Sequence, residues 1–226
     1  FISAIVAQCV YAAYFFLRLF ALFRSRYTAT VPKGVSIIIC ARDEADNLRR
    51  NLPAVLAQKY VVDFEVIVVN DASTDGSAEV LQELGQQYER LKQVTIMPGE
   101  VRTLKGKKFA LARGVAAAKH EWLMLTDADC RPASDEWLAQ MVAPLGAGKE
   151  IVAGYGGYHT APGVLNAFIR WETLHTFMQY STYAMAGLPY MATGRNMACT
   201  KTLLLQAQQH EFWNKVPSGD DDMLVR

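Results

Sequence analysis

The sequence lacks an excess of charge of either sign. Its 23 lysines and arginines balance 22 aspartates and glutamates, which leaves a formal net charge of +1 over 226 residues. Proteins that bind nucleic acid through its phosphates generally carry a clear positive excess, so we expect no nucleic-acid partner. With 51% hydrophobic and 20% charged residues, the composition also excludes a disordered or fibrous protein.

Cysteine is scarce and scattered. Cys9, Cys40, Cys130 and Cys199 form no C-x-x-C pair, and no cysteine and histidine cluster has the spacing of a zinc site. This pattern excludes a small module stapled by disulfides. We interpret the four cysteines as reduced thiols in a cytosolic environment.

A long apolar run opens the sequence. Residues 1–23 contain only Ser3, Gln8 and Arg18 as clearly polar members. As a helix the run would extend about 35 Å, enough to cross a hydrocarbon core of about 30 Å. Arg18 lies near its end, where a long side chain can reach the headgroups. The run predicts a transmembrane anchor, with a cleaved signal peptide and a buried helix as the alternatives.

Basic residues follow the apolar run directly. Arg24, Arg26 and Lys33 come next, and the positive-inside rule then puts the rest of the chain in the cytoplasm. We therefore expect a protein of the cell membrane with a cytoplasmic catalytic domain. The expected segments are a transmembrane anchor (1–23), a basic juxtamembrane linker (24–33) and one domain (34–226).

Short apolar strands alternate with amphipathic helices in the expected domain. Strands are predicted at 35–40, 64–69, 94–97, 122–126 and 151–155, and helices at 44–58, 77–88, 108–119 and 135–145. The strands are almost continuously apolar, which is typical of parallel strands covered on both faces. The pattern predicts an α/β, Rossmann-like domain with a mainly parallel sheet and helices on both faces.

Acidic residues follow three of the predicted strands. They occur in 41–44 after the first strand, in 70–76 after the second and in 127–129 after the fourth. Ligands bind beyond the carboxyl ends of the strands in such sheets, so we expect these clusters to converge there. Crowded carboxylates repel one another unless a cation lies among them, and Mg²⁺ with phosphate oxygens would satisfy them. Taken singly, the same acids also fit helix N-termini and turns.

The order of these motifs resembles that of the family 2 glycosyltransferases, whose domain has the GT-A fold. The matching segments are 35–48, 64–77, 105–114 (K-G-K-K-F-A-L-A-R-G), 127–129 (D-A-D), 193–198 (T-G-R-N-M-A) and 218–224 (S-G-D-D-D-M-L). The resemblance extends over about residues 34 to 226. It implies a GT-A domain behind a membrane anchor, in a sequence that we expect to be truncated at its C-terminus.

The resemblance implies roles for five residues on the donor side. Glu44 and Asp71 would hold the uridine part of a nucleotide sugar, and Lys107 would approach its diphosphate. Asp127 and Asp129 would bind Mg²⁺ or Mn²⁺, with Asp127 also contacting the donor. The implied donor is a UDP-sugar that carries a hexose or an N-acetylhexosamine.

A second set of residues would act on the acceptor. Asp221 would be the general base of an inverting transfer to a hydroxyl, with Asp220 and Asp222 as alternatives in an ambiguous register. Segment 193–198 would be a loop on the acceptor side, where Arg195, Asn196 and Asp220 would lie. A lipid-linked or saccharide acceptor at the cytoplasmic membrane face suits the predicted anchor.

Two other classes of function stay open from the residues alone. A nucleotidyltransferase also uses a nucleotide-binding α/β sheet with a metal. It would require a glycine-rich phosphate loop after the first strand, and residues 41–44 contain no glycine. A non-catalytic scaffold of the same fold is the other class. The acids Asp127, Asp129 and Asp221 argue against it, because a decayed site would lose carboxylates that are costly to keep together.

An aromatic stripe occupies residues 165–183. It includes Phe168, Trp171 and Leu174 around His175. We interpret His175 as a packed histidine rather than a catalyst. The stripe itself is expected to belong to the core, with an acceptor platform or a surface at the membrane interface as alternatives.

Overall fold

The computed structural model describes residues 1–20, 32–216 and 219–225, apart from the side chains of residues 212, 214 and 220. The last residues of the predicted anchor and nearly all of the predicted linker lie outside this description. The boundaries predicted for those two segments therefore stay predictions.

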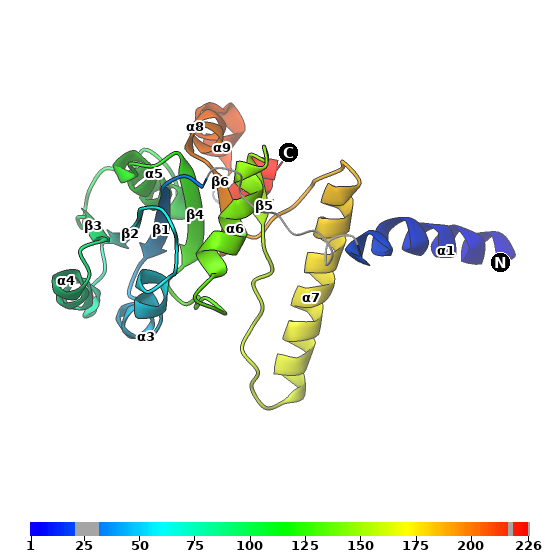
Figure 1. The fold of residues 1–226 in the computed structure, drawn as a ribbon, viewed down its shortest axis with the longest axis horizontal. Helices are drawn as coiled ribbons and strands as arrows, with labels where there is room; N and C mark the ends of the chain where they lie inside the picture. The colour runs from blue at the N-terminus through cyan, green and yellow to red at the C-terminus, as the bar shows by residue number, and fades with distance from the viewer. Residues whose placement is uncertain (21–31, 217–218, 226) are drawn as a thin grey trace.

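A six-stranded sheet lies at the centre of the domain (Figure 1). Its strands are β1 (Val35–Ala41), β2 (Phe64–Asp71), β3 (Leu91–Ile96), β4 (Trp122–Asp127), β5 (Ile151–Ala153) and β6 (Asn196–Thr200). They are arranged in the order β3-β2-β1-β4-β6-β5. The first four in this order are parallel, whereas β6 runs antiparallel to both β4 and β5. The predicted mainly parallel sheet is confirmed.

Helices cover both faces of the sheet. One face carries α3 (Ala45–Leu56), α4 (Ser77–Gln87) and α6 (Trp137–Gly146), and the other carries α5 (Lys107–Ala117), α8 (Lys201–Gln209), α9 (Glu211–Lys215) and α10 (Asp220–Val225). In β1, Ile37 and Ile39 pack into the first layer and Ile38 into the second. Because both faces of β1 are buried, its sequence is apolar except at Ser36, whose hydroxyl donates to Glu65, and it shows no alternation.

Helix α5 packs very close to the sheet at Gly114. A Cβ at this position would lie 2.6 Å from Cγ2 of Ile38 and 3.1 Å from Cγ2 of Val69. Only a residue without a side chain allows this approach, which also brings the N-terminal end of α5 to the carboxyl edge of β1 and β2.

The four predicted helices agree with α3, α4, α5 and α6 to within two residues at each end. Strand β3 begins at Leu91 rather than at 94, because it is an edge strand in which the polar residues Lys92 and Gln93 are exposed. Strand β6 was not predicted at all. The segment 193–198 was expected to be a loop, but its last three residues belong to β6. That expectation was wrong.

Two helices stand apart from the layered domain (Figure 1). Helix α1 (Ile2–Phe16) projects away from it and contacts α7 (Val164–Met185). Among the described residues, one helix, Ile2–Phe20, is long and apolar enough to cross a membrane. Its mean hydropathy is 1.6, and none of its apolar stretch is buried against the rest of the protein. This exposure contradicts the alternative of a buried helix. The core expectation for the aromatic stripe was wrong for Phe168 and Trp171, which are 57% and 58% exposed, and right for Tyr180, which is 3% exposed.

Candidate active site

The three predicted acidic segments meet at one edge of the sheet. Strand β1 lies between β2 and β4, with Cys40 in register with both Val69 and Asp127, so the ends of the three strands are adjacent. A cleft of about 380 Å³ opens there, which we call the acid cleft. All five residues predicted for the donor and the metal line it, together with two arginines: Glu44, Asp71, Lys107, Asp127, Asp129, Arg42 and Arg102.

Hydrogen bonds tie the loop after β1 to the loop after β2. The Asp43 carboxylate accepts from the Thr74 amide at 2.7 Å. Asp75 accepts from the Ala45 amide, at the start of α3, and from the Ser77 amide, at the start of α4, both at 2.9 Å. The Ser77 hydroxyl also donates to Asp75. The three hydrogen bonds, that of the hydroxyl foremost, lower the pKa of Asp75. Asp43 and Asp75 therefore hold the two loops that form the wall of the acid cleft, and their carboxylates are not expected to contact a ligand in it.

Asp71 is an acid of the cleft that already has a cationic partner. It ends β2, is buried, and takes two hydrogen bonds from the Arg102 guanidinium, one of them 3.1 Å from Nη1 to Oδ2. Glu44, half-buried, accepts from Asn47 Nδ2 at 2.6 Å. Sequence reasoning missed Arg102, since it lies between β3 and α5 in a stretch that carries no motif.

Adjacent lysines at the start of α5 point in opposite directions. Gly106, with a φ of +58°, precedes the helix, and Lys107 at its first position forms an ion pair with Asp127 in the acid cleft. Lys108 is 1% exposed. Its Nζ donates to the carbonyls of Trp213 at 2.9 Å and Val216 at 2.8 Å. Lys107 therefore serves the cleft, whereas Lys108 holds the C-terminal helices.

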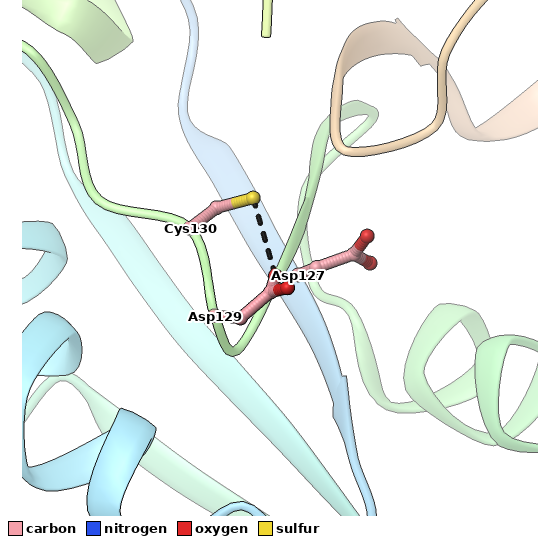
Figure 2. A group of neighbouring side chains, drawn as sticks. All are labelled: Asp127, Asp129 and Cys130. Atoms are coloured by element: carbon pink, nitrogen blue, oxygen red, sulfur yellow. Dashed lines mark hydrogen bonds between the residues drawn. The ribbon is translucent and has the colours of Figure 1, made fainter. Parts of the chain in front are cut away.

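Asp127, Asp129 and Cys130 form a candidate metal site. One potential ligand atom from each lies within 4.8 Å of the other two. In Figure 2 the Cys130 thiol points to Asp129, to which it donates at 3.4 Å, while the Asp127 carboxylate extends away from them. Burial, together with the two aspartates, raises the pKa of Cys130 to about 11, so its thiol is neutral at neutral pH. The two carboxylates fit a hard divalent cation, and the thiol does not.

Two further cavities continue from the acid cleft. The middle cleft, about 700 Å³, shares Asp129 with it and is also lined by Tyr155, Arg170, Arg195 and Asn196. The α10 pocket, about 210 Å³, shares Tyr155 and Arg195 with the middle cleft. The three cavities are therefore neighbours, with the middle cleft between the acid cleft and the α10 pocket. A larger cavity of about 850 Å³ lies elsewhere, between α8 and α10, and contains none of the donor-side acids.

The predicted base lies in the α10 pocket. Asp221, in the first turn of α10, accepts from the Gly194 amide at 2.9 Å, and Asp222 accepts from the Ala192 amide at 3.2 Å. Both aspartates line the pocket. Asp220 is the first residue of α10, and its side chain is not among those described.

The other acceptor-side residues have distinct environments. Arg195 lines both the middle cleft and the α10 pocket, with its guanidinium 4.9 Å from the ring centre of Tyr158. Asn196 accepts from Trp137 Nε1 at 3.0 Å and donates to the Tyr155 carbonyl at 2.9 Å. Asn196 thus holds the wall of the middle cleft, and Arg195 is the one that presents a charge to both cavities.

His175 lies outside these three cavities. Its ring stacks on Trp171 with 5.4 Å between the centroids and 12° between the planes. This ring contact agrees with the interpretation of His175 as a packed residue, although Trp171 itself is 58% exposed.

Comparison with known proteins gives a family match. Residues 36–198 match the family described as Glycosyl transferase family 2. The chain is 32% identical over 200 residues to Glycosyltransferase AglE of Haloferax volcanii, covering 86% of this chain and 60% of that protein. It is 32% identical over 150 residues to the Probable glycosyltransferase YdaM of Bacillus subtilis, covering 64% of this chain and 34% of that protein. The chain therefore spans less than two thirds of either relative.

Solved structures share the fold. The mannosyltransferase PcManGT of Pyrobaculum calidifontis, in complex with GDP-Man and Mn²⁺, aligns with a TM-score of 0.66 and 21% identity over 96% of this chain and 61% of that one. TarS 1-349 of S. aureus, in complex with UDP-GlcNAc, aligns with a TM-score of 0.58 and 16% identity over 85% of this chain and 52% of that one. At these identities the likeness shows the GT-A fold.

Proposed function

Because this chain belongs to glycosyl transferase family 2, we propose that it is an inverting glycosyltransferase that moves a sugar from a UDP-sugar to an acceptor hydroxyl. The observation that carries the proposal is the acid cleft, in which five separately predicted donor and metal residues line one cavity at the carboxyl edge of the sheet. The sugar is a hexose or an N-acetylhexosamine. The acceptor is a lipid-linked compound or a saccharide.

The nucleotide would lie across the ends of β1 and β2. Glu44 and Asp71 accept hydrogen bonds there from the base and ribose. The diphosphate lies at the N-terminus of α5, because Lys107 and the first amides of that helix offer it positive charge and donors. PcManGT and TarS were solved with the nucleotide sugars GDP-Man and UDP-GlcNAc, which supports a nucleotide-sugar donor but leaves the base to experiment.

Asp127 and Asp129 would hold Mg²⁺ or Mn²⁺. Their carboxylates suit a hard cation that also takes phosphate oxygens, and the neutral Cys130 thiol does not compete. When bound, the ion supplies positive charge that neutralises the diphosphate. Lys107 contributes further charge to the same group, and an ammonium that contacts a departing phosphate is most valuable where water is excluded.

Asp221 would act as the general base from the α10 pocket. Its carboxylate removes the proton from the acceptor hydroxyl as that oxygen bonds to the anomeric carbon, while the bond from that carbon to the diphosphate breaks. The amide of Gly194 orients the carboxylate. Attack opposite the leaving group inverts the anomeric centre, and the middle cleft between the acid cleft and the α10 pocket provides the space for it. No covalent intermediate is needed.

Helix α1 would anchor the enzyme in the cell membrane. The helical stretch Ile2–Phe20, which contains α1, is long and apolar enough to cross a membrane, and this supports the anchor. Arg24, Arg26 and Lys33 follow it in the sequence, and this basic stretch favours a cytoplasmic catalytic domain.

Calorimetric titration of the detergent-solubilised chain with UDP tests the donor site. GDP, CDP and ATP serve as controls, each with and without Mn²⁺. We expect metal-dependent binding selective for UDP, and Asp129→Ala should abolish the metal-dependent part. If the folded chain ignored all four nucleotides in the presence of metal, the donor site would be refuted.

Exchange of single aspartates in α10 tests the base. Asp221→Asn should keep UDP affinity while turnover falls by about 100- to 10,000-fold, the contribution typical of a general base. Asp222→Asn is the matched control, because the Asp222 carboxylate also accepts an amide hydrogen bond and lines the same pocket. If the losses were exchanged between the two variants, the base would be Asp222.

A further inference from the structure

Helix α7 has two faces with different surroundings. Thr173, Thr176, Phe177 and Tyr180 line the α10 pocket from one face. The other face, which we call the outer face, carries Val164, Phe168, Trp171 and Leu174, which are 87%, 57%, 58% and 43% exposed. These four residues recur at helical spacing, so they form one continuous stripe.

The stripe itself contains no residue with a fixed charge. The two charged residues of α7, Arg170 and Glu172, are exposed at its flanks, one helical turn from Leu174 and Phe168, and they also line the middle cleft and the α10 pocket. His175 is the titratable residue on the stripe, and its ring stacks on Trp171. An exposed apolar surface is unfavourable in water, and a contiguous one marks a contact with a partner or a membrane.

Contacts between α7 and α1 indicate that a membrane, rather than a protein partner, covers the stripe. The ring of Phe15 stacks on Tyr183, near the end of α7, with 4.3 Å between centroids, and the Tyr11 and Tyr183 hydroxyls lie 2.9 Å apart. Beyond this junction α1 continues away from the domain with no residue buried (Figure 1). The sheet lies on one side of α7, and α1 leaves on the other.

The direction of α1 sets the plane of a membrane that it crosses. In Figure 1, α1 and α7 run crosswise rather than side by side. A bilayer traversed by α1 therefore has its surface along α7, on the side away from the sheet. At the domain end of α1, the Arg18 guanidinium lies 3.9 Å from the Tyr14 ring centre. Arginine and tyrosine at such a position are typical of the headgroup level.

We infer that the outer face of α7 lies in the headgroup layer of the membrane that α1 crosses, so that the opposite face of the same helix presents the α10 pocket at the membrane surface. The inference rests on the proposed anchor and deepens the proposed function. An acceptor whose polar head stands at headgroup level can then reach Asp221 while its apolar part stays in the bilayer. Tryptophan and phenylalanine on one face suit this depth, about 5–10 Å into the boundary.

Fluorescence of the whole chain in vesicles tests the inference. Trp171 is 58% exposed, whereas Trp122 and Trp213 are 3% and 1% exposed, and Trp137 is half-buried. The probe is phosphatidylcholine brominated at carbons 6 and 7, or at 11 and 12, of one acyl chain. We expect quenching that is stronger with the shallower bromines and is lost in Trp171→Phe. The matched control, Trp137→Phe, should keep it.

Each other outcome has a definite meaning. If carbonate extraction leaves the chain in the vesicles but neither lipid quenches Trp171, the inference is overturned and the anchor stands. Stronger quenching by the deeper bromines would also overturn it, because the helix would then be buried in the hydrocarbon. If carbonate removes the chain, both the anchor and the inference fail. UDP titration in detergent is independent of all three results, so the proposed transferase activity is judged separately.

Discussion

The adjacent lysines at the start of α5 offer a matched pair of variants. Lys107→Met and Lys108→Met make the same chemical change one residue apart, but the two side chains lie in different places. Lys107 is 49% exposed in an ion pair with Asp127. Lys108 is buried and donates to the carbonyls of Trp213 and Val216. We therefore expect one variant to lose donor affinity and the other to lose stability.

The magnitudes follow from the contacts. An exposed ion pair contributes at most about 1 kcal/mol, so Lys107→Met should leave the unfolding temperature nearly unchanged. Loss of one charged contact to a diphosphate costs about 1.5–3 kcal/mol, or about 10- to 100-fold in the dissociation constant of UDP. Lys108→Met leaves the buried carbonyl of Trp213 and the partly buried carbonyl of Val216 without this donor, although it removes the cost of burying an ammonium. We expect a net loss of about 2–4 kcal/mol, which lowers the unfolding temperature by about 5–15 °C.

Two measurements on each variant separate these effects. Thermal unfolding followed by circular dichroism in detergent reports stability, and calorimetry with UDP and Mn²⁺ reports donor affinity below the unfolding temperature. An unfolding temperature of Lys108→Met equal to that of the wild type would show that the carbonyl contacts of Lys108 contribute nothing. An unchanged UDP affinity of Lys107→Met would show that Lys107 does not contact the donor.

Two more predictions concern the scaffold. Gly114→Ala should destabilise the domain by about 1–3 kcal/mol, because the new methyl group would meet Ile38 and Val69. Gly85→Ala in α4, where a Cβ meets nothing within 4 Å, should stabilise it by about 0.5–1 kcal/mol; equal effects in denaturant titrations would contradict both. For Glu65, burial alone would raise the pKa, but Lys92, the Ser36 hydroxyl and the Lys119 amide outweigh it, so the pKa is lowered. Its stabilising effect should be complete above the unfolded-state pKa of about 4.3 and should be lost as the pH falls through the lower folded-state value. The stability gap between wild type and Glu65→Gln should therefore close on acidification, and a gap that widened would refute the assignment.

The sheet and the donor-side acids could be predicted from the sequence because their signals are local. Strands β1, β2 and β4 are buried on both faces, so each reads as an apolar run that ends in polar residues. In a parallel sheet those ends must lie at one edge. The acid cleft follows from these two facts, and the structure brings Glu44, Asp71 and Asp127 together there.

The rest depends on contacts between distant segments. Strand β6 pairs with β4 about seventy residues earlier in the chain, for example Asn196 with Thr126. No local sequence pattern predicts an antiparallel strand between β4 and β5. Arg102 is recognisable only when Asp71 lies beside it. The apolar residues of α7 satisfy the same pattern as a core helix. Only their exposure and the neighbouring α1 distinguish a surface stripe from a buried one.

The charges of the acid cleft explain why its acids can lie so close together. Asp71 is paired with Arg102, and Asp127 is paired with Lys107, and both cations come from the segment that joins β3 to the first turn of α5. On the proposed function, a diphosphate competes with Asp127 for Lys107. The Asp127 carboxylate then becomes free to bind a divalent cation at the moment when the phosphates bring more negative charge. Donor and metal should consequently bind with positive coupling, and the coupling should be weaker in Lys107→Met, because in that variant Asp127 is unpaired before the donor arrives. Titration of Mn²⁺ with and without UDP measures this difference, and equal coupling in the two proteins would show that Lys107 does not control Asp127.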